Sequence, residues 1–242
     1  MTAQPDSMER IVPHELDPDE ATGSETLALH LDRYRFAAAH AVGPRLLDLA
    51  CGVAYGSRLL ADAHPESRVI AADLSTEALR EARQSYQHAS VHLLRGDGAT
   101  WCRSGAFNTI VSLETIEHVA APEALVAQFV SALAPGGHLI ASVPVTPSVD
   151  ANPHHRTDFS PSSFRGLGRA HGLDIVAELG QVQPFSPIAV LGRRERRSQG
   201  LRPQLLAYYA AHPSALLRRI GATLRYGFTN RYLTVAWRKP ER

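Results

Sequence analysis

The stretch of residues 46–57, LLDLACGVAYGS, decides the fold. Its first part is apolar at Leu46, Leu47 and Leu49, which is typical of a buried strand in a parallel sheet. Small residues then fill most of positions 51–56, and they allow the backbone to pass close to a ligand before a helix begins. The stretch therefore predicts a ligand-binding loop at the carboxyl end of a strand.

The next predicted strand, SRVIAAD, ends at Asp73, about one strand–helix–strand unit later. An acidic residue at that place can accept hydrogen bonds from the hydroxyl groups of a ribose. The loop itself reads D-x-A-C-G-x-A-x-G from Asp48, whereas a dinucleotide-binding loop reads G-x-G-x-x-G. These features predict a cofactor that contains a nucleoside, and they disfavour a nicotinamide oxidoreductase.

The loop resembles the first motif of class I S-adenosylmethionine (SAM) methyltransferases. Four further segments follow in the order and spacing of that family: LLRGDGAT with Asp97, FNTIVSL, ETIEHV and ALAPGGHLIASVP. The resemblance covers roughly residues 30–180, and the closing strand RYLTVAWRKP matches again. It implies an α/β fold with a doubly wound, Rossmann-like sheet of seven strands in the order 3-2-1-4-5-7-6. The last strand is expected to be antiparallel, with a helical insertion before it.

The resemblance also implies S-adenosyl-L-methionine as the cofactor. Asp97 would receive the adenine amino group, and Leu74 would give the adenine ring an apolar face. The complete set of expected cofactor contacts is Tyr34, Asp48, Ala50, Cys51, Gly52, Tyr55, Asp73, Leu74, Asp97, Gly98 and Leu113.

Two further features of the sequence bear on cofactor binding. Tyr34 or Arg35, on a helix predicted over about residues 22–41, could reach the methionine end of the cofactor, or Tyr34 could simply pack on the sheet. Ala50 and Ala54 stand where the family usually has glycine, and alanine adopts left-handed backbone angles only at a cost. We expect this difference to affect the tightness of cofactor binding.

The segment ETIEHV predicts the reactive site. Glu114, Glu117 and His118 are spaced i, i+3 and i+4, so they would share one face of a helix. His155, from the later NPHHRTDF segment, would join them, with His154 as the weaker candidate. Without a metal, His118 or His155 would be the general base, since imidazole titrates near neutral pH. The expected catalytic set is His118, His155 and Glu114.

The same pattern resembles a metal site of small-RNA 2′-O-methyltransferases and of ubiquinone-pathway O-methyltransferases. That resemblance implies a divalent cation held by Glu114, Glu117, His118 and His155. It favours Mg²⁺, while the imidazoles favour Mn²⁺, Fe²⁺ or Zn²⁺. The competing interpretation is that these side chains only line the pocket.

Composition sets the remaining expectations. A chain of 242 residues with 44% apolar residues predicts one domain over 22–242, after a flexible tail over 1–21. The insertion at about 184–225 would be a lid over the acceptor or a surface for self-association. Only two cysteines are present, and no signal peptide or membrane span is recognisable, which predicts a cytoplasmic protein without a membrane partner.

These features predict a SAM-dependent O-methyltransferase that acts on a hydroxyl, or as second choice a carboxyl, of a polar small molecule such as a sugar or a natural-product intermediate. One alternative is a metal-dependent RNA 2′-O-methyltransferase that uses a basic cluster between Arg193 and Arg202. The net charge of +1 argues against a nucleic-acid partner. Another alternative is a SAM-binding regulatory module without catalysis, which would have no need of so many ionisable residues. The insertion would also allow a homo-oligomer.

Overall fold

The computed structural model describes residue 13 and residues 21–97, 103–185, 202 and 204–241. The expected tail over 1–21 lies almost entirely outside the described residues, as do Gly98 and the basic cluster apart from Arg202. The gaps after residue 21 fall at 98–102, 186–201 and 203, and all seven strands of the sheet are described.

A single sheet of seven strands forms the centre of the fold, in the order β3-β2-β1-β4-β5-β7-β6. Strands β1 to β5 pair in parallel, whereas β7 runs antiparallel to both β5 and β6. The predicted strand order and the antiparallel last strand are therefore confirmed. The strands are β1 Arg45–Leu49, β2 Arg68–Asp73, β3 Val91–Arg95, β4 Phe107–Leu113, β5 Leu133–Pro144, β6 Asp174–Pro184 and β7 Thr229–Arg238.

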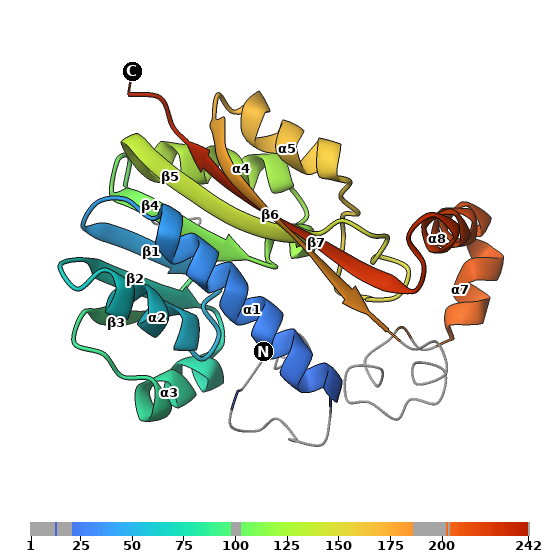
Figure 1. Cartoon of the computed structure of the whole chain (residues 1–242), viewed down its shortest axis with the longest axis horizontal. Coiled ribbons are helices and arrows are strands. Elements are labelled where there is room, and N and C mark those ends of the chain that lie inside the picture. The colour runs from blue at the N-terminus through green and yellow to red at the C-terminus, as the bar shows by residue number, and fades with distance from the viewer. Residues whose placement is uncertain (1–12, 14–20, 98–102, 186–201, 203, 242) are drawn as a thin grey trace.

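Helices cover both faces of this sheet (Figure 1). Neighbouring residues of a strand point to opposite faces, so Leu46 packs with the residues of α1 and α2, while Leu47 packs with those of α4 and α5. The described helices are α1 Ala21–His40, α2 Tyr55–Ala63, α3 Thr76–Ser85, α4 Pro122–Ala132, α5 Pro161–Ala170, α7 Leu205–Ala211 and α8 Pro213–Tyr226.

Local sequence signals explain where several helices begin. The hydroxyl of Ser75 accepts a hydrogen bond from the backbone N–H of Ala78 and caps α3. Ser160 caps α5 together with Ser163, directly before a proline in the first turn. These serines therefore define the residue at which each helix begins.

The insertion before the last strand contains α7 and α8. Figure 1 shows both helices beyond the end of β6 and β7, away from the helices that cover the sheet. Within the described part of the chain, no helix is long and apolar enough to span a membrane.

Candidate active site

The loop after β1 takes an unusual backbone path. Ala50, Gly52 and Ala54 all have positive φ angles, of 59°, 58° and 63°. The two alanines thus adopt the left-handed conformation that disfavours any residue with a Cβ, by about 1 kcal/mol or more each. A Cβ added to Gly52 would meet no protein atom within 4 Å, so the loop faces open space there. That space is where the cofactor is expected to approach the backbone.

Asp73 holds this loop in place from the end of β2. Its Oδ2 accepts a hydrogen bond from the N–H of Gly52 at 2.9 Å, and its Oδ1 accepts one from the N–H of Ser75 at 2.7 Å. Leu74 follows with 57% of its side chain exposed, and Asp97 lies exposed just after β3. The structure thus brings these predicted contacts to neighbouring strand ends, and their roles toward adenosine stay predictions.

Asp48 lies beneath the loop and is only 1% exposed. Desolvation raises its pKa to about 7, although hydrogen bonds from Ser57 at 2.5 Å and from Tyr34 at 3.2 Å and 3.3 Å lower it in part. The ring of Tyr34 packs directly on Gly56, where a Cβ would lie 2.0–2.3 Å from ring atoms. Tyr34 therefore packs on the sheet, and both residues support the loop from behind.

Two other predicted cofactor contacts lie on either side of the loop. Tyr55 places its hydroxyl 2.6 Å from Nδ1 of His30 on α1, and Leu113 is buried at the end of β4. Tyr55 also lines a shallow pocket of about 380 Å³ between α1 and α2. Because that pocket shares no other residue with the expected cofactor contacts, we do not assign it to the cofactor.

Glu114 corrects one expectation. It has a φ of 48° and precedes a short 3₁₀ helix, Ile116–His118, so it does not share a helix face with Glu117 and His118. Its Oε1 instead accepts a hydrogen bond from the hydroxyl of Ser142 at 2.7 Å and lies 3.6 Å from Nη1 of Arg33. The left-handed turn directs this carboxylate away from the histidines, so the ligand role for Glu114 would require it to leave both partners.

Glu117, His118 and His155 come together as expected. One potential ligand atom from each residue lies within 4.8 Å of the others. Glu117 is fully buried, and the two imidazole rings meet edge to face with centroids 4.7 Å apart. The backbone N–H groups of Arg156 and Thr157 donate to the carbonyl of Glu117, at 2.8 Å and 3.2 Å. These bonds hold the NPHHRTDF loop over the end of β4.

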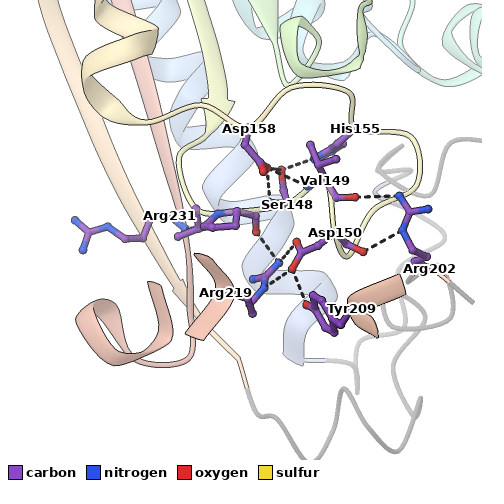
Figure 2. A network of polar contacts seen from close by, with 11 residues as sticks. Ser148, Val149, Asp150, His155, Asp158, Arg202, Tyr209, Arg219 and Arg231 are labelled. Carbon is purple, nitrogen blue, oxygen red and sulfur yellow. Dashed lines mark hydrogen bonds and ion pairs between the residues drawn. The ribbon is translucent and has the colours of Figure 1, made fainter. Parts of the chain in front are cut away.

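Hydrogen bonds orient both imidazole rings. Nδ1 of His118 lies 3.3 Å from the carbonyl oxygen of His154, which can only accept, so Nδ1 is the donor in this contact. Nδ1 of His155 lies 2.7 Å from the hydroxyl of Ser148, which donates in turn to Asp158 at 3.4 Å (Figure 2). A neutral ring that carries its proton on Nδ1 would present the lone pair of Nε2 to a metal ion or to a mobile proton.

Sequence reasoning missed Arg33. Its side chain is 4% exposed, its Nε donates to Gln181 at 2.8 Å, and its guanidinium lies 4.3 Å from the ring centroid of Tyr232. Arg35, the other candidate for the methionine end, is exposed and pairs with Asp32 at 2.7 Å. The available signal was helical spacing, because position 33 lies one turn before the fully buried Ala37.

Part of the chain is similar in sequence to known methyltransferases. Residues 46–137 match a family described as a methyltransferase domain. A trans-aconitate 2-methyltransferase of Acidovorax sp. (strain JS42) is 29% identical over 146 residues, which are 60% of this chain and 55% of that protein. The chain thus spans about half the length of the curated relatives it matches.

Solved structures show the same fold at low sequence identity. The cyclase SpnF superposes with a TM-score of 0.61 at 19% identity, covering 93% of this chain and 86% of that one. Phosphoethanolamine N-methyltransferase 2 of Haemonchus contortus, solved with S-adenosyl-L-methionine, gives a TM-score of 0.56 at 19% identity and covers 88% of this chain and 52% of that one. Residues 46–137 thus resemble a methyltransferase domain, and the solved structures share the α/β fold of this chain.

Proposed function

We propose that this protein transfers the methyl group of SAM to a hydroxyl of a polar small molecule, with a divalent cation at the acceptor. One observation carries the proposal: Glu117, His118 and His155 converge at the end of β4, beside the loop expected to hold the cofactor. Sugars and natural-product intermediates are the acceptor class that we expect.

The donor set fits a divalent metal ion. Metal–ligand bonds of about 2.0–2.2 Å place two ligand atoms of one ion at most roughly 4.3 Å apart. The ligand atoms of Glu117, His118 and His155 lie within 4.8 Å of one another, so small side-chain rotations would bring them to that spacing. One carboxylate with two imidazoles favours Mn²⁺, Fe²⁺ or Zn²⁺ over Mg²⁺. When bound, such an ion would orient the acceptor oxygen and lower the pKa of its hydroxyl.

The two imidazoles favour a hydroxyl as acceptor. Methyl transfer from a sulfonium requires alignment, exclusion of water and, for a hydroxyl, removal of a proton. A neutral imidazole of His118 or His155 would accept that proton, while the Nδ1 contacts keep the rings oriented. A carboxylate acceptor is already ionised at neutral pH and needs no base.

A carboxyl acceptor is the second candidate, because the matched relatives are named for trans-aconitate, which is a carboxylic acid. Arg33 supplies a buried cation at the same rim, 3.6 Å from Glu114. The two candidates differ in what they require of the histidines. A carboxylate substrate should still be methylated by variants that lack an imidazole.

The test uses isotope-labelled SAM with a panel of polyhydroxylated compounds and with trans-aconitate. For a hydroxyl acceptor, His118→Ala and His155→Ala should each lower kcat by about 10²-fold or more, with unchanged SAM affinity. His92→Ala, at an exposed position of β3, is the matched control. Undiminished turnover in both active-site variants would contradict the proposal and favour the carboxyl candidate.

Metal binding is tested separately by calorimetry with Mn²⁺ on the chelator-treated protein. Glu117→Gln, which keeps the shape of the side chain, should weaken binding by at least about tenfold. Glu114→Gln should leave Mn²⁺ affinity unchanged, because that carboxylate lies with Ser142 and Arg33. Absence of Mn²⁺, Fe²⁺ and Zn²⁺ binding would remove the ion and leave the histidines as general bases.

A further inference from the structure

We propose that α7 and α8, together with Phe228, form a docking element for a membrane surface that contains anionic lipids. We call residues 204–228 the helical insert. This inference concerns a different part of the molecule from the acceptor rim, and it does not depend on which acceptor is methylated.

The helical insert exposes many large apolar side chains. In α8 only Ala215 is buried, whereas Leu217 is 69% and Leu224 is 83% exposed. With Ile220 at 45%, they are spaced i, i+3 and i+7, which places them in one stripe along the helix. Leu206 on α7 is 85% exposed. A helix with an uncovered apolar stripe is typical of an interfacial membrane helix.

The charge of this region has a single sign. Between residues 196 and 240 the sequence contains nine lysines and arginines and neither aspartate nor glutamate. Arg218 and Arg225 are exposed on α8, seven residues apart and therefore on one side of the helix, next to the apolar stripe. The guanidinium groups of Arg225 and Arg231 both approach the ring of Tyr226, at 5.1 Å and 4.5 Å. Guanidinium groups beside an apolar stripe suit the phosphates of lipid head groups.

The anchoring of the helical insert leaves the stripe facing outward. Arg219 donates two hydrogen bonds to the carboxylate of Asp150 and one to the carbonyl of Pro147, and Tyr209 donates to Asp150 at 2.6 Å (Figure 2). Arg219 and Ala215 thus define the inner side of α8. Because 217 and 224 lie well around the helix from 215 and 219, the leucines point away from the anchor.

Charge also decides between possible occupants of this surface. A second copy of the chain would bring two cationic inserts together without any acidic partner in them, which is unfavourable. A nucleic acid would complement the arginines but not a stripe of leucines. An anionic bilayer complements both, and a helix that lies in the interface needs no transmembrane span. The sequence-based expectation of no membrane partner rested on the lack of a recognisable membrane span, which a helix lying in the interface does not need.

The test measures co-sedimentation of the full chain with vesicles of phosphatidylcholine alone or mixed with phosphatidylglycerol. We expect binding to the mixed vesicles only, decreasing as salt is added. Leu217→Glu and Leu224→Glu should each weaken binding by about tenfold or more. Val176→Glu, at a 48% exposed position of β6, should not.

The arginines require a separate comparison. Arg218→Gln and Arg225→Gln should each lower affinity for the mixed vesicles by about fivefold. Arg80→Gln on α3 is the control, since Arg80 is also exposed but pairs with Glu77. Thermal unfolding and SAM binding of each variant verify that it is folded.

Three results would overturn the proposal: no binding of the wild type to mixed vesicles, equal weakening by Val176→Glu, or binding that is insensitive to both leucine substitutions. A wild-type dimer that dissociates in Leu217→Glu, without vesicle binding, would assign the surface to a second copy of the chain.

Discussion

Asp48 is the residue whose chemistry depends most on its surroundings, because its carboxyl group is enclosed beneath the cofactor loop. Burial moves its pKa from 3.8 to about 7. The native state therefore binds a proton more tightly than the unfolded state does, and stability should fall as pH rises from about 4 to 7, by up to roughly 4 kcal/mol. Asp48→Asn should remove this dependence. Urea unfolding at pH 5 and pH 8 would measure the free energy of unfolding of both proteins. The variant should exceed the wild type by a larger amount at pH 8 than at pH 5.

The same group should make cofactor binding pH-dependent. SAM carries a sulfonium and an ammonium group, and these positive charges would favour the ionised form of Asp48. We expect SAM affinity to increase as pH rises through about 7 in the wild type, and to vary less in Asp48→Asn. Calorimetry in buffers of different ionisation heat would detect the released proton. Equal pH profiles for both proteins would show that Asp48 does not sense the cofactor.

Ala50 and Gly52 offer a matched pair of substitutions in the loop. Ala50 is exposed and has a φ of 59°, so Ala50→Gly should stabilise the protein by about 0.5–1 kcal/mol without loss of packing. Gly52→Ala should cost about 1 kcal/mol of stability, because alanine disfavours the φ of 58° at this position. The cost stays small because the added Cβ meets no protein atom within 4 Å. The effect of Gly52→Ala on SAM affinity should be much larger, because the methyl group would occupy the space of the cofactor. Thermal unfolding and SAM titration separate the two effects.

At the scale of elements, Asp150 joins the helical insert to the loop that carries His155. Burial alone would raise the pKa of Asp150, but the hydrogen bonds and charge of Arg219 and the hydroxyl of Tyr209 together hold it below its ordinary value. Because the carboxyl of Asp150 is 3% exposed, removal of its charge leaves Arg219 without its buried partner.

Asp150→Asn should therefore weaken docking of the helical insert by about 3 kcal/mol. We expect faster hydrogen exchange in residues 205–226, with the sheet and SAM affinity unaffected. Glu178→Gln breaks the more exposed ion pair with Arg165 and should change stability by less than about 1 kcal/mol. Unchanged exchange in Asp150→Asn would show that other contacts hold α7 and α8.

At the scale of the whole molecule, the strand order could be predicted because five motifs, in order and spacing, resemble those of one family whose sheet has this order. The convergence of Glu117, His118 and His155 was also predictable, since their loops leave adjacent strands β4 and β5. The position of Glu114 was not, because no local signal marks a left-handed glutamate. The partner of Arg33 was not predictable either, because Gln181 lies 148 residues away and such a pair leaves no trace in local periodicity.

The place of β7 between β5 and β6 has a consequence for synthesis on the ribosome. Within the described residues β6 pairs only with β7, whose residues 229–238 are made after it, so β6 cannot join the sheet before β7 has emerged. The contacts of α1 with β6 must also wait, because the Leu29 carbonyl and Arg33 of α1 bind Gln181 on β6. The strands that carry the cofactor loop can form early, whereas closing the opposite edge requires contacts between segments far apart in the sequence, which are slow to form. A nascent chain stalled before residue 229 should therefore expose the side of α1 that carries Arg33, while α1 still packs on β1 and α2.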